Sequence, residues 1–257
     1  MLICIIPARG NSKGIPRKNL SIVGKMSLVE YALGLAATCK LIEKIILSTD
    51  NLEIAKLLTQ HVENSSVKFD KKENDVLYIN EKLSIHRRKA EDAKDNSRTI
   101  DGVIDVIKKM SLKPSDQILL LQPTSPFRTT KEIVQLIDSL NSNEEYDSIF
   151  SARIFESPHP SKSFQLNSKG SINANSELIK NLGTPRQELP SFYIADGAFY
   201  LSSVESILRN QSFVSLKSKI FIRHGLKTIN IDTVEDLEFA RWVISKHKFD
   251  FFEGLYD

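Results

Sequence analysis

The sequence predicts an α/β fold in which helices cover both faces of a mostly parallel sheet. Short apolar runs alternate with amphipathic helical patterns, which is the order expected of βαβ units. One run, Ile118 to Leu121, is apolar without alternation, as in a central strand that is buried on both faces. The length of 257 residues suits one main domain, which we expect to span residues 1–257.

The elements are expected in a regular order along the chain. The expected strands are residues 2–6, 44–48, 76–79, 117–122, 197–201, 218–223 and 226–231, and the expected helices are residues 27–39, 51–60, 99–110 and 233–247. Ser27 and Glu30 make a capping box at the start of the first helix, and Thr129 with Glu132 starts a further helix.

Two segments depart from this order. The stretch from Val67 to Ser97 is polar and mixed in charge, and it predicts a long excursion. The second segment, residues 151–190, is rich in Ser, Asn and Pro and has no helical period. We expect it to leave the main sheet as an extended arm or hairpin.

Composition excludes some classes of protein. Apolar residues make up 41% and charged residues 26%, which is typical of a folded globular protein. A net charge of +3 is far from that of a dedicated nucleic-acid binder, and no apolar run is long enough to span a bilayer. Cys4 and Cys39 lie among apolar residues and are expected in the core of a cytoplasmic protein.

Residues 6–19, IPARGNSKGIPRKN, form a basic loop directly after the first strand. Its cations are Arg9, Lys13, Arg17 and Lys18, and no carboxylate precedes Glu30. Gly10 and Gly14 would let backbone N–H groups approach an anion closely. The loop has neither the Walker nor the dinucleotide-binding spacing, so it predicts another kind of polyphosphate site. The alternative is a basic surface turn that the glycines and prolines merely shape.

Two further motifs follow predicted strands. LLLQPTSPFRTTKE places the polar side chains of Gln122, Thr124 and Ser125 at the carboxyl edge of the sheet, where open α/β sheets bind ligands. INIDTVEDLEFA places Asp232 between a strand and a helix, a position suited to Mg²⁺ that is shared with substrate phosphates. The alternatives are a proline-braced turn for the first motif and favourable charge at a helix start for Asp232.

Four segments together resemble one family over nearly the whole chain. PARGNSKGIPRKN, LQPTSPFRT, PRQELP followed by DGAFY, and NIDTVEDLE are similar, in this order, to segments of the CMP-sialic acid synthetases, or N-acylneuraminate cytidylyltransferases. The resemblance implies a Rossmann-like sheet, a homodimer joined through the segment at about 151–190, and a Mg²⁺ cofactor. It also implies the coupling of CTP to a sialic acid or related nonulosonic acid, with release of pyrophosphate.

The resemblance assigns roles residue by residue. The implied catalytic residues are Arg9, Lys13, Lys18 and Asp232; the nucleotide contacts are Arg9, Asn19, Arg88 and Thr99; the sugar contacts are Gln122, Thr124, Lys162, Arg186 and Asp196; and the metal ligands are Asp232 and Asn230. The cations of the loop would hold the triphosphate, and Asn19 would contact the ribose. Catalysis would then be direct attack of the anomeric hydroxyl on the α-phosphorus, aided by positioning and electrostatics.

The chain also departs from the family pattern, and several substrates stay open. Asn230 stands where many members have a second metal-binding Asp, and Asp196 where many have Asn. Legionaminic, pseudaminic and Kdo-type acids are alternative substrates for the same reaction. A sugar-1-phosphate nucleotidyltransferase is a rival enzyme, and a catalytically silent nucleotide-binding protein is the alternative from another class.

Overall fold

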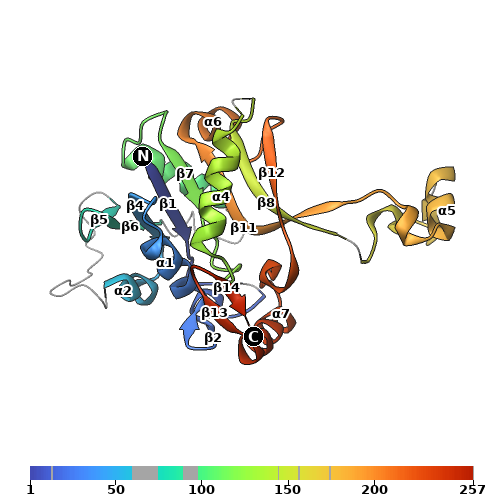
Figure 1. Ribbon diagram of the computed structural model, residues 1–257, viewed down its shortest axis with the longest axis horizontal. Helices are drawn as coiled ribbons and strands as arrows, with labels where there is room; N and C mark the ends of the chain where they lie inside the picture. The colour runs from blue at the N-terminus through green and yellow to red at the C-terminus, as the bar shows by residue number, and fades with distance from the viewer. Residues whose placement is uncertain are drawn as a thin grey trace.

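A single large sheet is the centre of the molecule (Figure 1). The structure is a computed structural model that describes residues 1–12, 14–59, 75–88, 98–143, 145–155, 157–173 and 175–256. In spatial order the strands that these residues form in the main sheet are β12 (Ser218–Arg223), β8 (Ser148–Ile154), β11 (Tyr193–Ser203), β7 (Gln117–Leu120), β1 (Leu2–Pro7), β4 (Lys44–Thr49), β6 (Leu83–Arg87) and β5 (Val76–Tyr78). From β7 to β6 the strands run parallel, whereas β11 is antiparallel to both of its neighbours. The predicted α/β fold with a mostly parallel sheet is confirmed.

Helices and short hairpins complete the described part of the chain. The helices are α1 (Leu28–Thr38), α2 (Leu52–Thr59), α3 (Thr99–Lys109), α4 (Thr130–Asn141), α5 (Ser176–Gly183), α6 (Val204–Asn210) and α7 (Val234–Lys246). The 3₁₀ turns are η1 (Lys18–Leu20), η2 (Pro160–Lys162), η3 (Arg186–Glu188) and η4 (Gly225–Thr228). The hairpins pair β2 (Ile22–Val23) with β3 (Met26–Ser27), β9 (Gln165–Leu166) with β10 (Ile172–Asn173), and β13 (Lys248–Asp250) with β14 (Gly254–Tyr256). Within the described ranges, each helix is too short or too polar to cross a bilayer.

The central strand β1 shows how the sheet is buried on both faces. Ile3 and Ile5 pack into the cluster formed with α3 and α6, whereas Cys4 and Ile6 pack into the cluster formed with α1, α2 and α4. This alternation follows from the period of two along a strand. Cys4 and Cys39 are both buried free thiols, as expected.

A third layer, built on α7, lies beside the loop that follows β1. Leu237, Ala240 and Val243 of α7 pack against Ile15 of this loop and Tyr31 of α1. The predicted capping boxes at the starts of α1 and α4 are present, and a third one, Thr233 with Asp236, starts α7. The helix starts beside the loops are therefore fixed by local hydrogen bonds.

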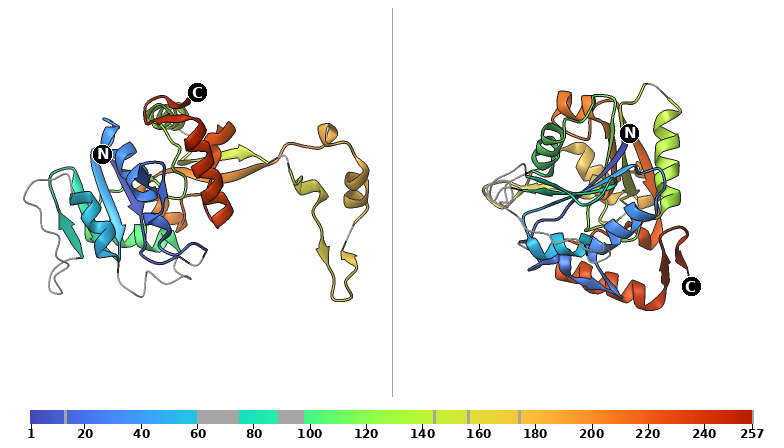
Figure 2. Two further views of the ribbon diagram at one scale, coloured as in Figure 1. Left: turned by 90° about the horizontal axis from the view of Figure 1, so that it is seen from below. Right: turned by 90° about the vertical axis from the view of Figure 1, so that its left-hand side faces the viewer.

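The arm projects away from the sheet between β8 and β11, and α5 lies at its far end (Figures 1 and 2). We define the arm as residues 155 and 157–192, residues 156 and 174 being outside the description. The expected excursion at about 151–190 starts too early, because residues 151–154 still pair with β11 and β12. The expectation of no helix was also wrong, since Asn175 Oδ1 accepts the Leu178 N–H at 2.8 Å and caps α5.

The expected strand at 226–231 is the clearest error. The chain there forms η4 and then an extended stretch outside the sheet. The apolar alternation instead reflects Ile229 and Ile231 packing into the α7 cluster, and the Ile231 N–H donates to the Thr124 carbonyl at 2.8 Å. Residues 67–74 and 89–97 of the predicted polar excursion lie outside the described residues.

Candidate functional site

A cavity of about 290 Å³ lies where the loops after several sheet strands meet, and we call it the sheet-edge cavity. Its lining residues are Pro7, Arg9, Ser12, Lys18, Asn19, Arg88, Thr99, Gln122, Pro123, Thr124, Asn230 and Asp232. The structure therefore brings together most of the predicted site residues from four separate stretches of sequence. Lys13, which was also predicted for this site, lies outside the described residues.

The loop after β1 points one of its lysines at the chain segment before α7. Lys18 is mostly buried, and its Nζ donates to the Ile231 carbonyl and to Asp232 Oδ1, both at 3.0 Å. Arg17 adopts a left-handed conformation, with φ of 55°, and pairs with Glu53 of α2. Of these two neighbouring cations, only Lys18 lines the cavity.

The two glycines of the loop are required by close packing. A Cβ on Gly10 would lie 2.7 Å from Asn51 Nδ2, and one on Gly14 would lie 2.6 Å from the Asp232 carbonyl oxygen. The Gly10 N–H donates to Asp50 Oδ1 at 2.7 Å, so this N–H is bonded to a carboxylate of the protein itself. The sequence indicates correctly that glycine is needed at these positions. The need arises because neighbouring chain segments approach closely.

Asn19 and Arg88 are both buried residues that line the cavity. Asn19 Nδ2 donates to the Arg9 carbonyl at 2.8 Å and so closes the loop on itself. Arg88 directly follows β6, and its guanidinium packs against Gly102 of α3, where an added Cβ would lie 3.2 Å from Nη2. Thr99, at the first turn of α3, completes this side of the cavity.

Asp232 supplies an accessible carboxylate to the cavity. Its side chain is 65% exposed, Oδ1 accepts from Lys18, and Oδ2 accepts from Asn230 Nδ2 at 2.7 Å. Burial opposes ionisation of the neighbouring Asp236, but the N–H groups of Thr233 and Asp232 outweigh it and lower the Asp236 pKa. Asp236 therefore serves the helix start, and Asp232 stays available to a ligand.

The donor set fits a magnesium ion only if substrate oxygens share it. Within the described ranges no three His, Cys, Asp or Glu side chains form a metal cluster. One carboxylate, on Asp232, and one amide, on Asn230, meet beside Lys18 at the cavity. Mg²⁺ is usually bound through one or two carboxylates together with phosphates and waters, so these residues suit a metal that arrives with a polyphosphate.

Asp196, predicted as a sugar contact, is buried below the cavity. Its carboxylate accepts from Arg223 Nη1 at 2.9 Å, from the Ala198 N–H at 3.1 Å and from the Ser151 hydroxyl. The side chain is not accessible to solvent, so these bonds give it a structural role. Contact with a sugar at this position stays a prediction.

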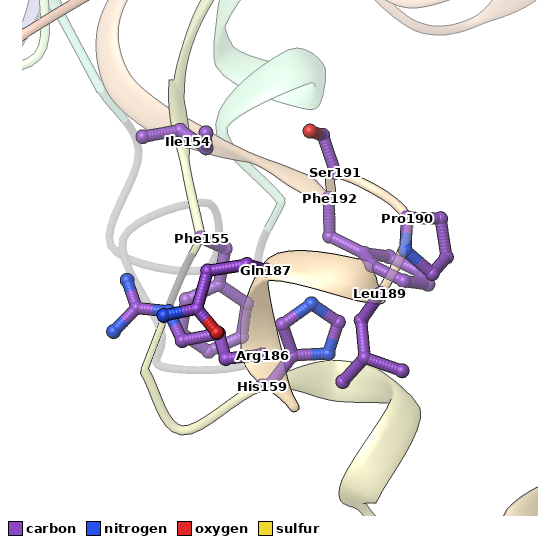
Figure 3. A pocket seen from close by; sticks show the side chains of 9 residues that line it. All are labelled: Ile154, Phe155, His159, Arg186, Gln187, Leu189, Pro190, Ser191 and Phe192. Atoms are coloured by element: carbon purple, nitrogen blue, oxygen red, sulfur yellow. The ribbon is translucent and has the colours of Figure 1, made fainter. Parts of the chain in front are cut away.

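Lys162 and Arg186 lie on the arm, and neither lines the sheet-edge cavity. Lys162 Nζ donates to the Thr184 carbonyl at 2.8 Å and helps to fold the arm on itself. Arg186 lines a second cavity of about 350 Å³, the arm cavity, together with His159 and Phe192 (Figure 3). The rings of His159 and Phe192 pack edge to face, with their centroids 5.5 Å apart. The predicted sugar contacts are thus divided: Gln122 and Thr124 line the sheet-edge cavity, Lys162 and Arg186 lie on the arm, and Asp196 is buried.

Sequence reasoning missed two buried arginines behind the site. Arg223 ends β12, and its guanidinium binds Asp196 and Glu132, each at 2.9 Å. Arg128 Nη1 donates to the Ala198 carbonyl at 3.0 Å, and burial lowers the Arg128 pKa to about 9. No periodic pattern in the sequence identifies such residues. Asp196 and Glu132 do lie within apolar elements, however, and carboxylates that are buried there indicate that buried cations must balance them.

Comparisons with known proteins relate the chain to cytidylyltransferases. A family model described as cytidylyltransferase matches residues 3–82. The chain is 29% identical to the CMP-N,N'-diacetyllegionaminic acid synthase of Legionella pneumophila, covering 91% of this chain and 92% of that protein. It is 26% identical to the pseudaminic acid cytidylyltransferase of Campylobacter jejuni, covering 93% and 94%. It is also 26% identical to the N-acylneuraminate cytidylyltransferase of Streptococcus agalactiae, covering 91% of this chain and 51% of that protein.

Solved structures share the fold at low sequence identity. A CMP:2-keto-3-deoxy-manno-octonic acid synthetase complexed with CTP aligns with a TM-score of 0.62 and 15% identity, covering 95% of this chain and 98% of that chain. A 4-diphosphocytidyl-2C-methyl-D-erythritol synthase from Anaerococcus prevotii aligns with a TM-score of 0.59 and 14% identity, with the same coverage.

Proposed function

We propose that the chain, which is similar to named cytidylyltransferases, couples CTP to a nonulosonic acid, giving the CMP-sugar and pyrophosphate. One observation carries the proposal. The sheet-edge cavity gathers Arg9, Lys18, Asn19 and Arg88 around the exposed carboxylate of Asp232. Cations beside one metal-binding carboxylate suit a triphosphate that arrives with Mg²⁺.

The nucleotide occupies the sheet-edge cavity in this proposal. Arg9 and Lys18 hold the phosphates, Asn19 contacts the ribose, and Arg88 with Thr99 forms the wall that faces the base. The loop that carries Arg9, Lys18 and Asn19 follows β1, whose side chains pack into cores on both faces of the sheet, and this supports a site whose groups are already in place for a triphosphate. Lys13 is assigned to the same phosphates on the resemblance alone.

The reaction is a direct displacement at the α-phosphorus. The anomeric hydroxyl oxygen of the sugar forms the new P–O bond, the bond to the bridging oxygen of the β-phosphate breaks, and pyrophosphate leaves with that electron pair. The hydroxyl proton passes to water. Arg9 and Lys18 stabilise the charge that builds on the departing pyrophosphate. A magnesium ion held by Asp232 and Asn230 would supply further charge neutralisation there.

The sugar acid is recognised by groups from two places. Gln122 and Thr124 face the sheet-edge cavity from the loop after β7, whereas Lys162 and Arg186 lie on the arm. We propose that the protein is a homodimer whose arm brings these two cations to the partner's cavity, where they bind the sugar carboxylate. Exposed apolar side chains on the arm, including Phe164, support a partner surface there.

Subunit mixing tests this assignment. Asp232→Ala removes the cavity function and Arg186→Ala the arm function, so each variant alone should be inactive or slow. In a random mixture, half of the dimers are hybrids with one intact site of two, so about a quarter of the wild-type activity should return. Lys169→Ala, at the tip of the arm, is the control. A mixture with no gain over its components would contradict the shared site.

The choice of acid is part of the proposal. Named relatives act on pseudaminic, N,N'-diacetyllegionaminic and N-acylneuraminic acids, so a nine-carbon acid of this type is the expected substrate. Pyrophosphate release should be measured with CTP, Mg²⁺ and a panel of these acids together with Kdo, and with UTP and ATP as controls. Release with one acid and CTP supports the function. CTP binding without release for every acid favours a silent nucleotide-binding protein.

A cytoplasmic location also belongs to the proposal. Cys4 and Cys39 are buried free thiols, which suits a reducing compartment. Fractionation of the source cells, with detection by an antibody against the purified chain, tests it.

A further inference from the structure

A series of buried polar groups leads from Arg223, at the end of β12, to the sheet-edge cavity. Arg223 is fully buried and donates to Glu132 Oε1 at 2.9 Å, to Asp196 Oδ2 at 2.9 Å and to the Phe127 carbonyl at 2.7 Å. Every bond ties a different element to the end of β12. A buried ion pair of this kind holds its partners in one arrangement, because breaking either bond leaves an unpaired charge.

Asp196 uses this anchor to fix a bulge in β11. The pairing of β11 with β8 shifts register between Ala195 and Tyr200, and Asp196 Oδ1 accepts the Ala198 N–H within the shifted segment. Gly197 has a φ of +74°, a conformation that favours glycine. The bulge is thus held from below by the Asp196 carboxylate, and the backbone carbonyl of Asp196 faces Ser125.

Gly197 lies directly beneath three polar side chains of the site. A Cβ at this position would lie 3.2 Å from Asn230 Oδ1, 3.3 Å from Gln122 Oε1 and 3.3 Å from Ser125 Oγ. The bulge therefore forms the floor on which these groups rest. A displacement of the bulge would move all three together.

Ser125 is the link between this floor and Asn230. Its Oγ is 3.1 Å from the Asp196 carbonyl oxygen and 3.2 Å from Asn230 Oδ1. A hydroxyl has one hydrogen, and a carbonyl oxygen can only accept, so a bond to Asp196 uses that hydrogen. Ser125 can then still accept a bond from the Asn230 side, but only from an amide NH₂.

The Asn230 amide accordingly has two arrangements. In one, Nδ2 donates to Asp232 Oδ2 at 2.7 Å and Oδ1 faces Ser125. In the other, Nδ2 donates to Ser125, and Oδ1 lies beside the Asp232 carboxylate. Two oxygens placed side by side repel each other unless a cation binds both. The second arrangement satisfies every hydrogen-bonding group when a divalent cation is present.

We propose that Ser125, held by the buried Asp196–Arg223 pair, is a positioning residue that turns the Asn230 amide oxygen toward the Asp232 carboxylate when a divalent cation binds. The inference rests on the proposed function, because the cation arrives with CTP. In this role Ser125 and Asp196 act through Asn230. An asparagine in place of a second carboxylate therefore requires a hydroxyl that fixes which amide atom faces the metal.

Metal binding without turnover tests the inference. The probe is Mn²⁺ with the non-reacting analogue α,β-methylene-CTP, and free Mn²⁺ is measured by electron paramagnetic resonance. Ser125→Ala should weaken Mn²⁺ binding about tenfold, the lower end of what loss of a group that orients a metal ligand costs. Ser84→Ala removes another buried serine hydroxyl, on β6, and is the matched control.

A second background separates positioning from simple loss of structure. Asn230→Asp replaces the amide by a carboxylate, whose two oxygens are equivalent and need no orientation. In this background Ser125→Ala should leave Mn²⁺ affinity nearly unchanged, and thermal unfolding of all variants shows whether each is folded. An equal loss in both backgrounds, or none in the wild-type background, overturns the inference.

The result also separates this inference from the proposed function. Normal CTP binding and turnover, with Mn²⁺ affinity insensitive to Ser125→Ala, removes the positioning role alone. Failure of the wild-type protein to bind the CTP analogue overturns both.

Discussion

The sheet-edge cavity and the arm cavity are built in opposite ways. The first lies at the ends of strands whose side chains are fully buried, and it collects residues from four distant segments. The second is formed within one stretch of chain, and α5, η2 and η3 of the arm bury none of their residues. The groups proposed to act on phosphate thus lie at the edge of the core, and the arm cations lie where one chain alone provides little packing.

The contrast shows that catalysis and the choice of the sugar acid can be located in different parts of the molecule. A site that must stabilise developing charge depends on groups that do not reorganise. A region that chooses among related sugar acids can lie on a separate segment that changes without disturbing the core. The contrast predicts that substitutions in the two places change different measured quantities.

The largest effect is expected for Asp232→Ala. Loss of the accessible carboxylate in the sheet-edge cavity should reduce kcat at least a hundredfold, while CTP still binds through the cations. Pyrophosphate release and calorimetric CTP binding measure the two quantities. Glu235→Ala, in the first turn of α7 and outside the cavity lining, is the control. Near-normal turnover in Asp232→Ala would remove the metal assignment.

Lys18→Ala should have the next largest effect on kcat. Its Nζ loses both bonds to the segment before α7, and the phosphates lose a cation, so a fall in kcat of about a hundredfold is expected. Lys25→Ala, outside the cavity lining, should stay within twofold. A change in KM for CTP alone, with kcat preserved, would show that Lys18 binds the ground state and the transition state equally.

Arg186→Ala tests the other cavity. Removal of a cation that binds the sugar carboxylate should raise KM for the acid about tenfold and leave CTP binding unchanged. Steady-state kinetics with each substrate varied in turn separates the two. An equal rise in KM for CTP would place Arg186 at the nucleotide and break the comparison.

Stability should separate the two regions as well. Leu119→Ala opens a cavity in the fully buried centre of β7 and should lower the free energy of unfolding by about 2–5 kcal/mol. Leu166→Ala on the arm, where the side chain is 64% exposed, should change it by less than about 0.5 kcal/mol at low protein concentration. Chemical denaturation measures both. A large effect at Leu166 that grows with protein concentration would indicate burial by a partner.

The smallest effect concerns pH and His86. Burial lowers the His86 pKa, although its bond to Asp105 opposes this shift. In the unfolded chain His86 has the ordinary histidine pKa of about 6.5, so the unfolded chain takes up this proton more readily than the folded one. Folding stability should therefore fall as the pH drops below about 6.5. The slope should not exceed about 1.4 kcal/mol per pH unit. Denaturation between pH 7 and 5 measures it, and His86→Gln should flatten the curve; an unchanged slope would exclude His86 as the cause.

The sequence predicted much of the fold because periodicity and capping are local signals. The strands β1, β4, β7 and β12 and the capping boxes of α1 and α4 followed from short patterns. The prediction of a strand at 226–231 was wrong, because the alternation of Ile229 and Ile231 reflects their packing against α7. Helix α5 was missed: it is only eight residues long, so Leu178, Ile179 and Leu182 give a helical spacing of barely two turns.

The site could be predicted in part for the same reason. Residues on loops after parallel strands meet at one edge, so Arg9, Lys18 and Gln122 were found together as expected, whereas Asp232 reaches the same cavity from an extended stretch outside the sheet. The Asp196–Arg223 pair joins residues that are 27 positions apart and depends on a register shift in β11. No local pattern reports such a tertiary pairing.

The close approach of Gly14 to the Asp232 backbone has a consequence for how this protein can change over time. Because a Cβ at Gly14 would lie 2.6 Å from the Asp232 carbonyl oxygen, neither position can drift independently. A side chain at Gly14 is tolerated only in a lineage that has already moved the backbone at Asp232. The two stretches, more than 200 residues apart in the chain, are therefore expected to be inherited as one unit, and a chimera that takes them from different ancestors should lose function.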